Sequence, residues 1–489
     1  MNAENNSLKH FKVIFIGLMI SLLMVLLDST ITNTAMPKII ASLSGLEYYV
    51  WPVTIYLTTL VISAMLSGRL SDFYGSKKTF IGALIIFMLG SVLCGFSQNM
   101  VELIIFRALQ GLGAGIIATA PLKIVAELLP PRQRGKYLGM FMAAGGIASV
   151  AGPTLGGYIT DTLGWPWIFF VNVPIGIMAL SLLIPYLPEL GTIVKEKIMD
   201  YWGIITFTSG LISFLIALTL IEENKTISVA LVVSLILFAG IMLLGFVYAE
   251  KRAKEPILPM YLFKNSVFSV SNISMFLAGA VMLAYSIYIP FFLQSVQGMS
   301  PSVSGTYLIP LMFSMMIASI LAGQIISKTG KYKNIAIMSF AIGIIGMLLL
   351  STLNADTTLL QLIIYEVIVG VSAGIAPPLF TAAAQNAVAK RDIGVVTSSI
   401  MYFRYIGGII CLAILGAIVN MTLNLNLQTS NVSVSSSLLV TAIHNVFIIA
   451  AILNIIGFVL CFFLKDLHMS NEMEEINYEE IPGEDEILN

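Results

Sequence analysis

Long apolar stretches separated by short polar segments make up most of this chain. A bilayer core about 30 Å thick is crossed by a helix of about 20 apolar residues. Fourteen stretches reach about that length: 11–34, 48–68, 78–98, 101–122, 136–159, 166–187, 202–222, 228–248, 268–293, 303–326, 335–353, 358–380, 395–419 and 443–464. The pattern therefore predicts an all-α polytopic membrane protein with 14 transmembrane helices.

Composition supports this prediction and excludes several classes of protein. Of the 489 residues, 58% are hydrophobic and 10% are charged, whereas a soluble domain carries about 25% charged residues. The cysteines lie in apolar stretches and the histidines are isolated, so we expect no disulfide, metal site or cofactor. The chain has no phosphate-binding Gly-x-x-x-x-Gly-Lys-Ser/Thr sequence and no basic patch away from the membrane-flanking segments. We expect neither an enzyme, nor direct use of ATP, nor nucleic-acid binding.

The positions of Lys and Arg predict which way the helices run. If the N-terminus is cytoplasmic, all 25 Lys and Arg except Lys38, Lys225, Arg107 and Arg404 lie in cytoplasmic segments. Cytoplasmic loops carry an excess of these residues in membrane proteins generally. We therefore predict a multi-pass protein of the bacterial cell (cytoplasmic) membrane with both termini in the cytoplasm.

An internal repeat divides the predicted helices into groups. Residues 103–116 match residues 362–375 without a gap, and residues 68–75 match residues 323–330. Two six-helix bundles at 1–190 and 261–465 explain both matches, with two inserted helices at 191–260 and an acidic, disordered tail at 466–489. Such repeats are typical of transporters that bind substrate near the bilayer midplane between the two halves. Because two halves make one complete transport unit, we expect a monomer.

Four ionisable residues lie well inside predicted helices: Asp28, Arg107, Glu366 and Arg404. A charge in hydrocarbon costs about 2.5–3.5 kcal/mol even on lenient scales, so each marks a candidate functional position. Asp28, Arg107 and Glu366 fall at similar depth, and Asp28 can pair with Arg107. Glu366 has no Arg at its depth, which makes it the main candidate for binding protons and substrate, with Asp28 second. A purely structural ion pair is the alternative, and the role of Arg404 stays open.

The short loop at residues 68–78 is a candidate latch between two helices. Gly68 and Gly75 permit close helix approach and a tight turn, and Asp72 can bind a helix N-terminus or an Arg. Lys77 follows in the same loop. The alternative is an anchoring loop whose charges only set the topology. The loop resembles the signature loop of the major facilitator superfamily.

A glycine-rich motif at residues 145–157 resembles the fifth-helix motif of antiporters in that superfamily. Gly152, Gly156 and Gly157 allow close helix packing, and Pro153 after Gly152 allows a pivot. Simple packing is the alternative interpretation.

Three further segments resemble the fourteen-helix drug:proton antiporter family within that superfamily. They are residues 27–37, 165–176 and 255–263, although Pro166 stands where the family usually has Arg. The resemblance covers nearly the whole chain. In that family, acids of the first helix and the fourth-helix Arg are implicated in proton coupling, which here implies Asp28 and Arg107.

The resemblance implies a proton-driven multidrug efflux antiporter that exports lipophilic, cationic, drug-like molecules by alternating access. The same scaffold could instead export or flip an endogenous metabolite, siderophore or lipid, and a non-transporting membrane receptor or assembly factor is the alternative of a different class. Besides Glu366 and Asp28, candidate substrate-binding residues are Tyr56, Tyr365, Tyr288, Phe292 and Gln294, which could also face lipid or pack internally.

Overall fold

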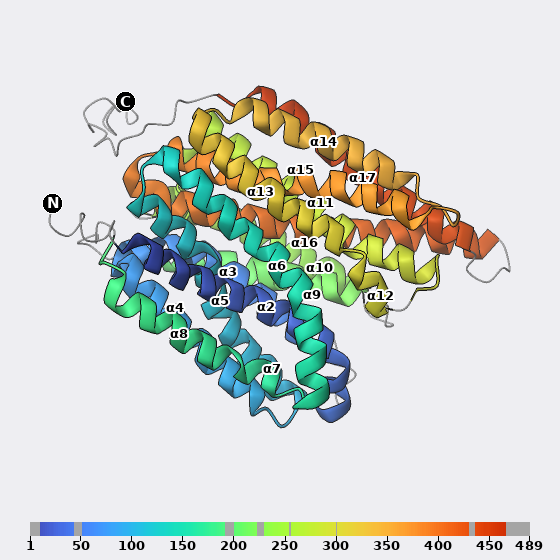
Figure 1. Ribbon diagram of the computed structural model, residues 1–489, viewed down its shortest axis with the longest axis horizontal. Helices are drawn as coiled ribbons and strands as arrows, with labels where there is room; N and C mark the ends of the chain where they lie inside the picture. Colours follow the sequence, from blue (N-terminus) through green and yellow to red (C-terminus); the bar gives the residue numbers. More distant parts are fainter. Residues whose placement is uncertain are drawn as a thin grey trace.

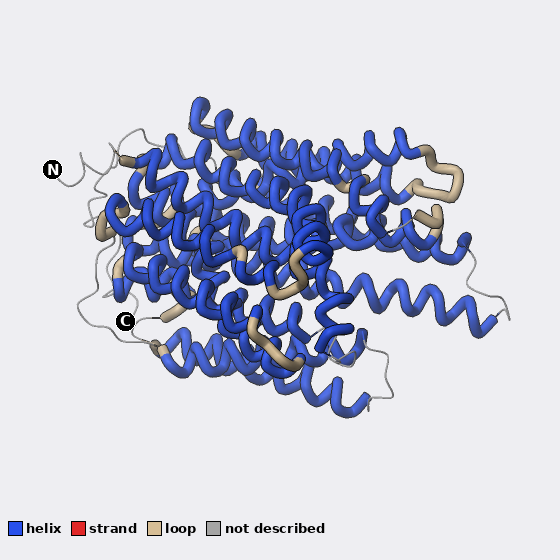
Figure 2. The backbone as a smooth tube through the Cα atoms, turned by 60° about the horizontal axis from the view of Figure 1, so that its bottom comes forward, coloured by secondary structure: helices blue, strands red, loops and turns tan. Residues whose placement is uncertain are grey.

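The computed structural model describes residues 10–43, 51–190, 200–222, 229–253, 256–299, 301–429 and 436–465. These residues form helices joined by short loops, with no strand among them (Figure 2). The longer helices are α2 (Phe11–Leu43), α3 (Trp51–Tyr74), α4 (Ser76–Gly95), α5 (Met100–Leu128), α6 (Pro131–Thr162), α8 (Asn172–Tyr186), α9 (Tyr201–Glu222), α10 (Val229–Arg252), α11 (Ser266–Ser295), α13 (Ile309–Thr329), α14 (Lys333–Ser351), α15 (Leu359–Asn386), α16 (Ile393–Thr429) and α17 (Ser436–Phe462). Shorter ones are α7 (Trp167–Phe170), α12 (Pro301–Thr306), η2 (Met260–Lys264) and η3 (Lys390–Asp392).

Every predicted apolar stretch overlaps a helix, but the count of membrane crossings is not confirmed. Within the described residues, twelve segments are long and apolar enough to cross a membrane. The two predicted spans outside this set correspond to α6 and α9. Both stretches are nevertheless helical, α6 over Pro131–Thr162 and α9 over Tyr201–Glu222. Fourteen crossings therefore remain a prediction.

Several helices extend beyond or divide the predicted stretches: α2 continues to Leu43 and α16 to Thr429. The stretch predicted at 101–122 continues as α5 to Leu128, because the charge of Lys123 is buried in a contact rather than left at a helix end. The stretch predicted at 166–187 is divided into α7 and α8 at Val171.

Local sequence explains several helix ends. The Thr358 side chain accepts the Gln361 N–H, and the Gln361 side chain accepts the Thr358 N–H, which forms a capping box at the start of α15. Asn265 caps α11. Gly75, with φ of 86°, makes the left-handed turn between α3 and α4 that the sequence predicted.

The helices of the two predicted bundles pack mainly within their own sets. Helix α5 packs against α3 and α4, and α2 against α6 and α8; α15 packs against α13 and α14, and α11 against α16 and α17. The first set lies mostly in the lower part of Figure 1 and the second in the upper part, with α6 alongside α13. The predicted domain boundaries remain predictions, and the acidic tail lies outside the described residues.

Helices α3 and α6 contact α16 and α13 across the two sets through glycine. A Cβ at Gly68 would lie 2.6 Å from the Gly394 carbonyl oxygen, and a Cβ at Gly135 would lie 2.9 Å from that of Gly323. We call the end of the bundle where α2 begins and α17 ends the basic end. Both glycine contacts lie near it.

Candidate functional site

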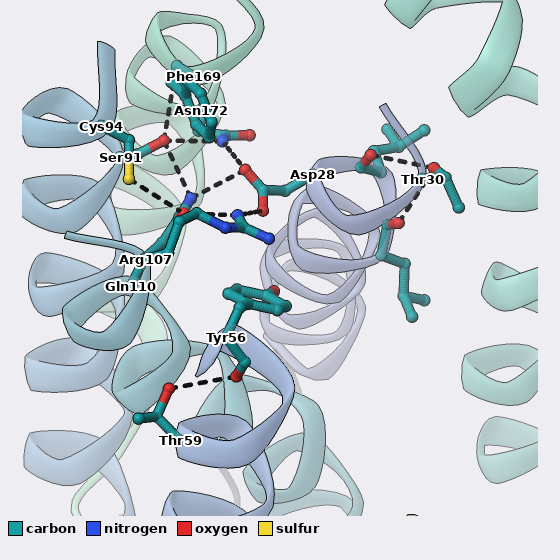
Figure 3. A network of polar contacts seen from close by, with 12 residues as sticks. Asp28, Thr30, Tyr56, Thr59, Ser91, Cys94, Arg107, Gln110, Phe169 and Asn172 are labelled. Carbon is teal, nitrogen blue, oxygen red and sulfur yellow. Dashed lines mark hydrogen bonds and ion pairs between the residues drawn. The ribbon is translucent and has the colours of Figure 1, made fainter. Parts of the chain in front are cut away.

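Asp28 of α2 and Arg107 of α5 form an ion pair inside the helix bundle. The Arg107 Nη1 atom donates to Asp28 Oδ2 at 2.7 Å, and both residues are 1% exposed (Figure 3). The sequence predicted that these residues could pair, and the structure places them together. A buried pair is costly to desolvate, so its geometry and its further hydrogen bonds decide whether it is stable.

Three further buried polar side chains complete this cluster. Gln110 and Asn172 each donate an amide N–H to Asp28 Oδ1, at 2.8 and 2.7 Å. Ser91 accepts from both amides and donates to the backbone of α7 (Figure 3). Asp28 thus receives three hydrogen bonds, two from α5 and one from the start of α8, and these compensate its ionised form.

Tyr56 of α3 covers the guanidinium on its other side. The Arg107 Cζ atom lies 3.9 Å from the centre of the Tyr56 ring, a cation–π contact, and Tyr56 is fully buried (Figure 3). Tyr56 was predicted to bind substrate. Its ring is instead occupied by Arg107 in this state.

Glu366 of α15 has the opposite environment. It is 0% exposed, and neither carboxylate oxygen has a hydrogen-bond partner among the described residues. Leu362 and Val369, one turn to either side on the same helix, belong to an apolar cluster that also contains residues of α11, α13 and α17. An ionised carboxylate without a partner is far more costly there than the neutral acid. The described surroundings of Glu366 therefore offer no compensation for a charge, whereas Asp28 has an ion-pair partner and two amide donors.

The other predicted substrate contacts are distributed unevenly. Tyr288 and Phe292 are buried in the same apolar cluster as the neighbours of Glu366, and Tyr365 packs against it half-buried. Gln294 is exposed and donates to the Ser304 hydroxyl at 2.8 Å, so the structure does not place it with this group.

Arg404 of α16 lies about 16 Å from the start of its helix, near the middle of a bilayer. Its guanidinium contacts the sulfur of Met282 at 3.2 Å and that of Met142 at 3.8 Å. Thioethers are weak acceptors. These contacts compensate the charge poorly, and they place Arg404 where α6, α11 and α16 meet.

The candidate latch forms with a partner that the sequence did not predict. Asp72 accepts a hydrogen bond from Lys123 Nζ of α5 at 2.6 Å, rather than from an Arg. Both groups lie against Gly394 in the first turn of α16, which is the helix N-terminus that the prediction allowed. Lys77 is half-buried in the first turn of α4 and is not the partner of Asp72.

The repeated position in the second half makes a neutral counterpart of this latch. The Ser327 hydroxyl accepts the Lys136 N–H in the first turns of α6, at 3.0 Å. Arg132 donates to the Ser327 and Lys328 carbonyl oxygens, at 3.0 and 2.6 Å. The end of α3 therefore lies against the start of α16, and the end of α13 lies against the start of α6.

The glycine-rich motif of α6 faces α2. Gly152 and Gly156 lie directly against Thr30 and Ile31, whereas Gly157 faces open space. The Thr30 hydroxyl donates to the Ala148 carbonyl oxygen at 3.2 Å. Helix α6 continues through Pro153, so close packing is observed at two of the three glycines and the pivot remains a prediction.

Comparison with known proteins gives this arrangement its context. Residues 18–411 match the Major Facilitator Superfamily. The chain belongs to this superfamily. It is 40% identical to the multidrug transporter protein MdtP of Bacillus subtilis over 83% of this chain and 74% of that protein. It is 35% identical to multidrug resistance protein 3 of the same organism, over 83% and 79%.

Solved structures of superfamily members support the fold. The human organic anion transporter MFSD10 aligns with a TM-score of 0.67 at 14% identity, over 92% of this chain and 99% of that one. The xylose symporter XylE aligns with a TM-score of 0.65 at 14% identity, over 94% and 97%. The chain is thus a multi-pass membrane transporter by family, and the resemblance seen in its motifs is confirmed at the level of the superfamily and of multidrug efflux relatives.

Sequence reasoning missed four members of these sites: Ser91, Gln110, Asn172 and Lys123. Gln110 lies three residues after Arg107, on the same face of α5, and that spacing could have indicated it. Asn172 lies within the motif at 165–176, where only the resemblance was used. Lys123 was assigned to the set of charges that determines topology, and its burial became visible only once α5, α3 and α16 were placed together.

Proposed function

We propose that this superfamily member is a proton-coupled multidrug antiporter that exports lipophilic cations by alternating access, as a monomer. The observation that carries the proposal is Glu366, a fully buried carboxyl group inside the helix bundle whose two oxygens have no hydrogen-bond partner in the described part of the chain. A proton or a cationic substrate can compensate such a group, and the two would compete for it.

The proposed cycle uses two carboxylates with different environments. Ionised Glu366 attracts a lipophilic cation from the cytoplasm, and a proton displaces the cation at the outer side. The neutral site then returns without a buried charge. Asp28 can take up a second proton only when Arg107 moves away, because the present geometry compensates the ionised form of Asp28.

We infer that the basic end faces the cytoplasm, since Lys and Arg concentrate there. The contacts of α3 with α16 and of α6 with α13 then describe a state in which the cytoplasmic side is closed. Opening that side would separate both pairs of helices.

Export of one specific metabolite is the second candidate function. Some relatives have such names: a protein of Gibberella zeae named as a rubrofusarin-specific efflux pump is 31% identical over 83% of this chain. The scaffold is shared, so the substrate, rather than the mechanism, separates this candidate from the first.

The test is substrate-driven proton movement in proteoliposomes. Purified protein is reconstituted with a pH-sensitive dye inside, and lipophilic cations are added under an imposed pH gradient. The wild type should move protons when the cation is added, and Glu366→Gln should lose this coupling while it still reconstitutes. Asp356→Asn, an exposed loop carboxyl, is the matched control and should behave as the wild type.

Each contrary result has a defined meaning. Undiminished proton movement in Glu366→Gln would refute its role as a proton carrier. A wild type that ignores every lipophilic cation but moves protons with a cellular extract would favour the single-metabolite exporter.

A further inference from the structure

The inserted pair α9–α10 ends in a buried carboxylate that binds the next segment of the chain. Glu250, near the end of α10, is 3% exposed. Its two oxygens accept the backbone N–H groups of Ile257 and Leu258, at 3.2 and 2.9 Å. A carboxylate that accepts two adjacent N–H groups fixes the conformation of the segment that carries them. We call residues 256–265, which connect α10 with α11, the strap.

The strap is bonded to the first half of the transporter. The Arg69 Nε atom donates to the Pro256 carbonyl oxygen at 2.7 Å. Arg69 follows Gly68, the residue through which α3 contacts Gly394 of α16. The carbonyl that Arg69 binds lies one residue before the N–H groups that Glu250 holds, so Glu250 orients it.

The other end of the strap is bonded to the second half. The Tyr261 hydroxyl donates to Asp392 Oδ1 at 2.8 Å, immediately before α16, and the Asn265 side chain donates to the Ala387 carbonyl oxygen at 2.7 Å. Burial and the contact with Asp392 raise the pKa of Tyr261, so its hydroxyl remains a donor at neutral pH.

These bonds cross the place where the two halves meet at the basic end. Separation of α3 from α16 must break either the Arg69 contact or the contacts with Asp392 and Ala387. The inserted helices support the same region, because α9 packs against both α3 and α16 and the Phe207 ring lies 5.1 Å from that of Tyr402.

We propose that Glu250 is a positioning residue that holds the strap across α3 and α16, and that the inserted pair thereby stabilises the state closed at the basic end. The inference is independent of which substrate or ion the transporter uses, since it concerns only the separation of the two halves.

The test measures the distance across the basic end in purified protein without substrate. Spin labels at Lys78→Cys and Lys331→Cys, both exposed, report one position in each half, and pulsed electron resonance gives their distance distribution. The three native cysteines are buried, and a variant that lacks both labelling sites measures any background from them. Glu250→Ala and Tyr261→Phe act on different bonds of the strap. Both variants should move population from the short distance to a longer one. For Tyr261→Phe, which loses a hydrogen bond to a carboxylate, the ratio of the long-distance to the short-distance population should rise about tenfold.

Tyr248→Phe is the matched control, because it removes an exposed hydroxyl from α10 without touching the strap. Its distance distribution should equal that of the wild type. If Glu250→Ala misfolds, Tyr261→Phe carries the test alone, with its melting temperature measured alongside.

The proposal is overturned if Tyr261→Phe, folded and monodisperse, keeps the distribution of the wild type. It is overturned equally if the shift in Tyr261→Phe is no larger than that in Tyr248→Phe. This inference and the proposed function can fail separately. If Tyr261→Phe shifts the distance but Glu366→Gln keeps proton coupling, only the proposed function fails. If Glu366→Gln loses coupling but Tyr261→Phe leaves the distance unchanged, only this inference fails.

Discussion

Removal of one charge of the Asp28–Arg107 pair should lower the stability of the protein far more than removal of both charges. Arg107→Met leaves Asp28 ionised with only the amide donors of Gln110 and Asn172. Breaking a buried ion pair in this way costs about 3–5 kcal/mol of stability. The double variant Asp28→Asn with Arg107→Met removes both charges of the pair, so its cost in stability should fall well below the sum of the single costs, with a coupling free energy of about 2 kcal/mol or more.

The measurement is a double-mutant cycle on equilibrium unfolding in mixed detergent micelles, with Asp28→Asn as the other single variant. The chain offers a matched comparison in Lys38 and Asp161, a surface pair whose side chains are 58% and 67% exposed. Lys38→Met and Asp161→Asn should couple by no more than about 1 kcal/mol. A coupling at the buried pair no larger than at this surface pair would refute the assignment of Asp28 as an ionised partner of Arg107.

Three further predictions have defined outcomes. Arg404→Met should raise the unfolding free energy by up to about 3 kcal/mol, because it removes a poorly compensated charge from the membrane. A variant less stable than the wild type in the same micelles would show that the guanidinium is well compensated. Gly68→Ala should increase thiol labelling of a cysteine placed on the basic-end face of α16, since its Cβ would lie 2.6 Å from the Gly394 carbonyl oxygen; unchanged labelling would show that α3 and α16 do not need this approach. Gly152→Val should abolish transport at normal expression because it meets Thr30, whereas Gly157→Ala faces open space and should retain activity.

The apolar pattern predicted the positions of the helices well, because the requirement of a bilayer for long apolar helices leaves a direct mark on the sequence. It predicted less about charged or glycine-rich helices. Helix α6 begins at Pro131, before the predicted stretch, in a turn that carries Arg132 and Arg134, and it packs along both α2 and α13.

The sequence predicted site residues that stand out as charges in apolar stretches. It did not predict contacts that depend on how the helices pack. Asp28, Arg107 and Glu366 stand out because charges are rare in such stretches. Two features depend on side chains from several helices: Glu366 has no partner among the residues that the structure describes, and the Tyr56 ring is covered by Arg107. The partner of Asp72 was ambiguous in sequence because many basic residues flank the membrane, and only the burial of Lys123 distinguishes it.

The contact between α6 and α13 has a consequence for turnover. Gly135 meets Gly323, Gly139 meets the Ser319 backbone, and Gly146 meets the Met312 carbonyl, so the two helices touch largely through main chain. At these glycines there is no side chain that must leave a rotamer well when the helices part. Such a surface can be taken apart and remade repeatedly with a low barrier, whereas interlocked leucines and phenylalanines would have to repack on every pass.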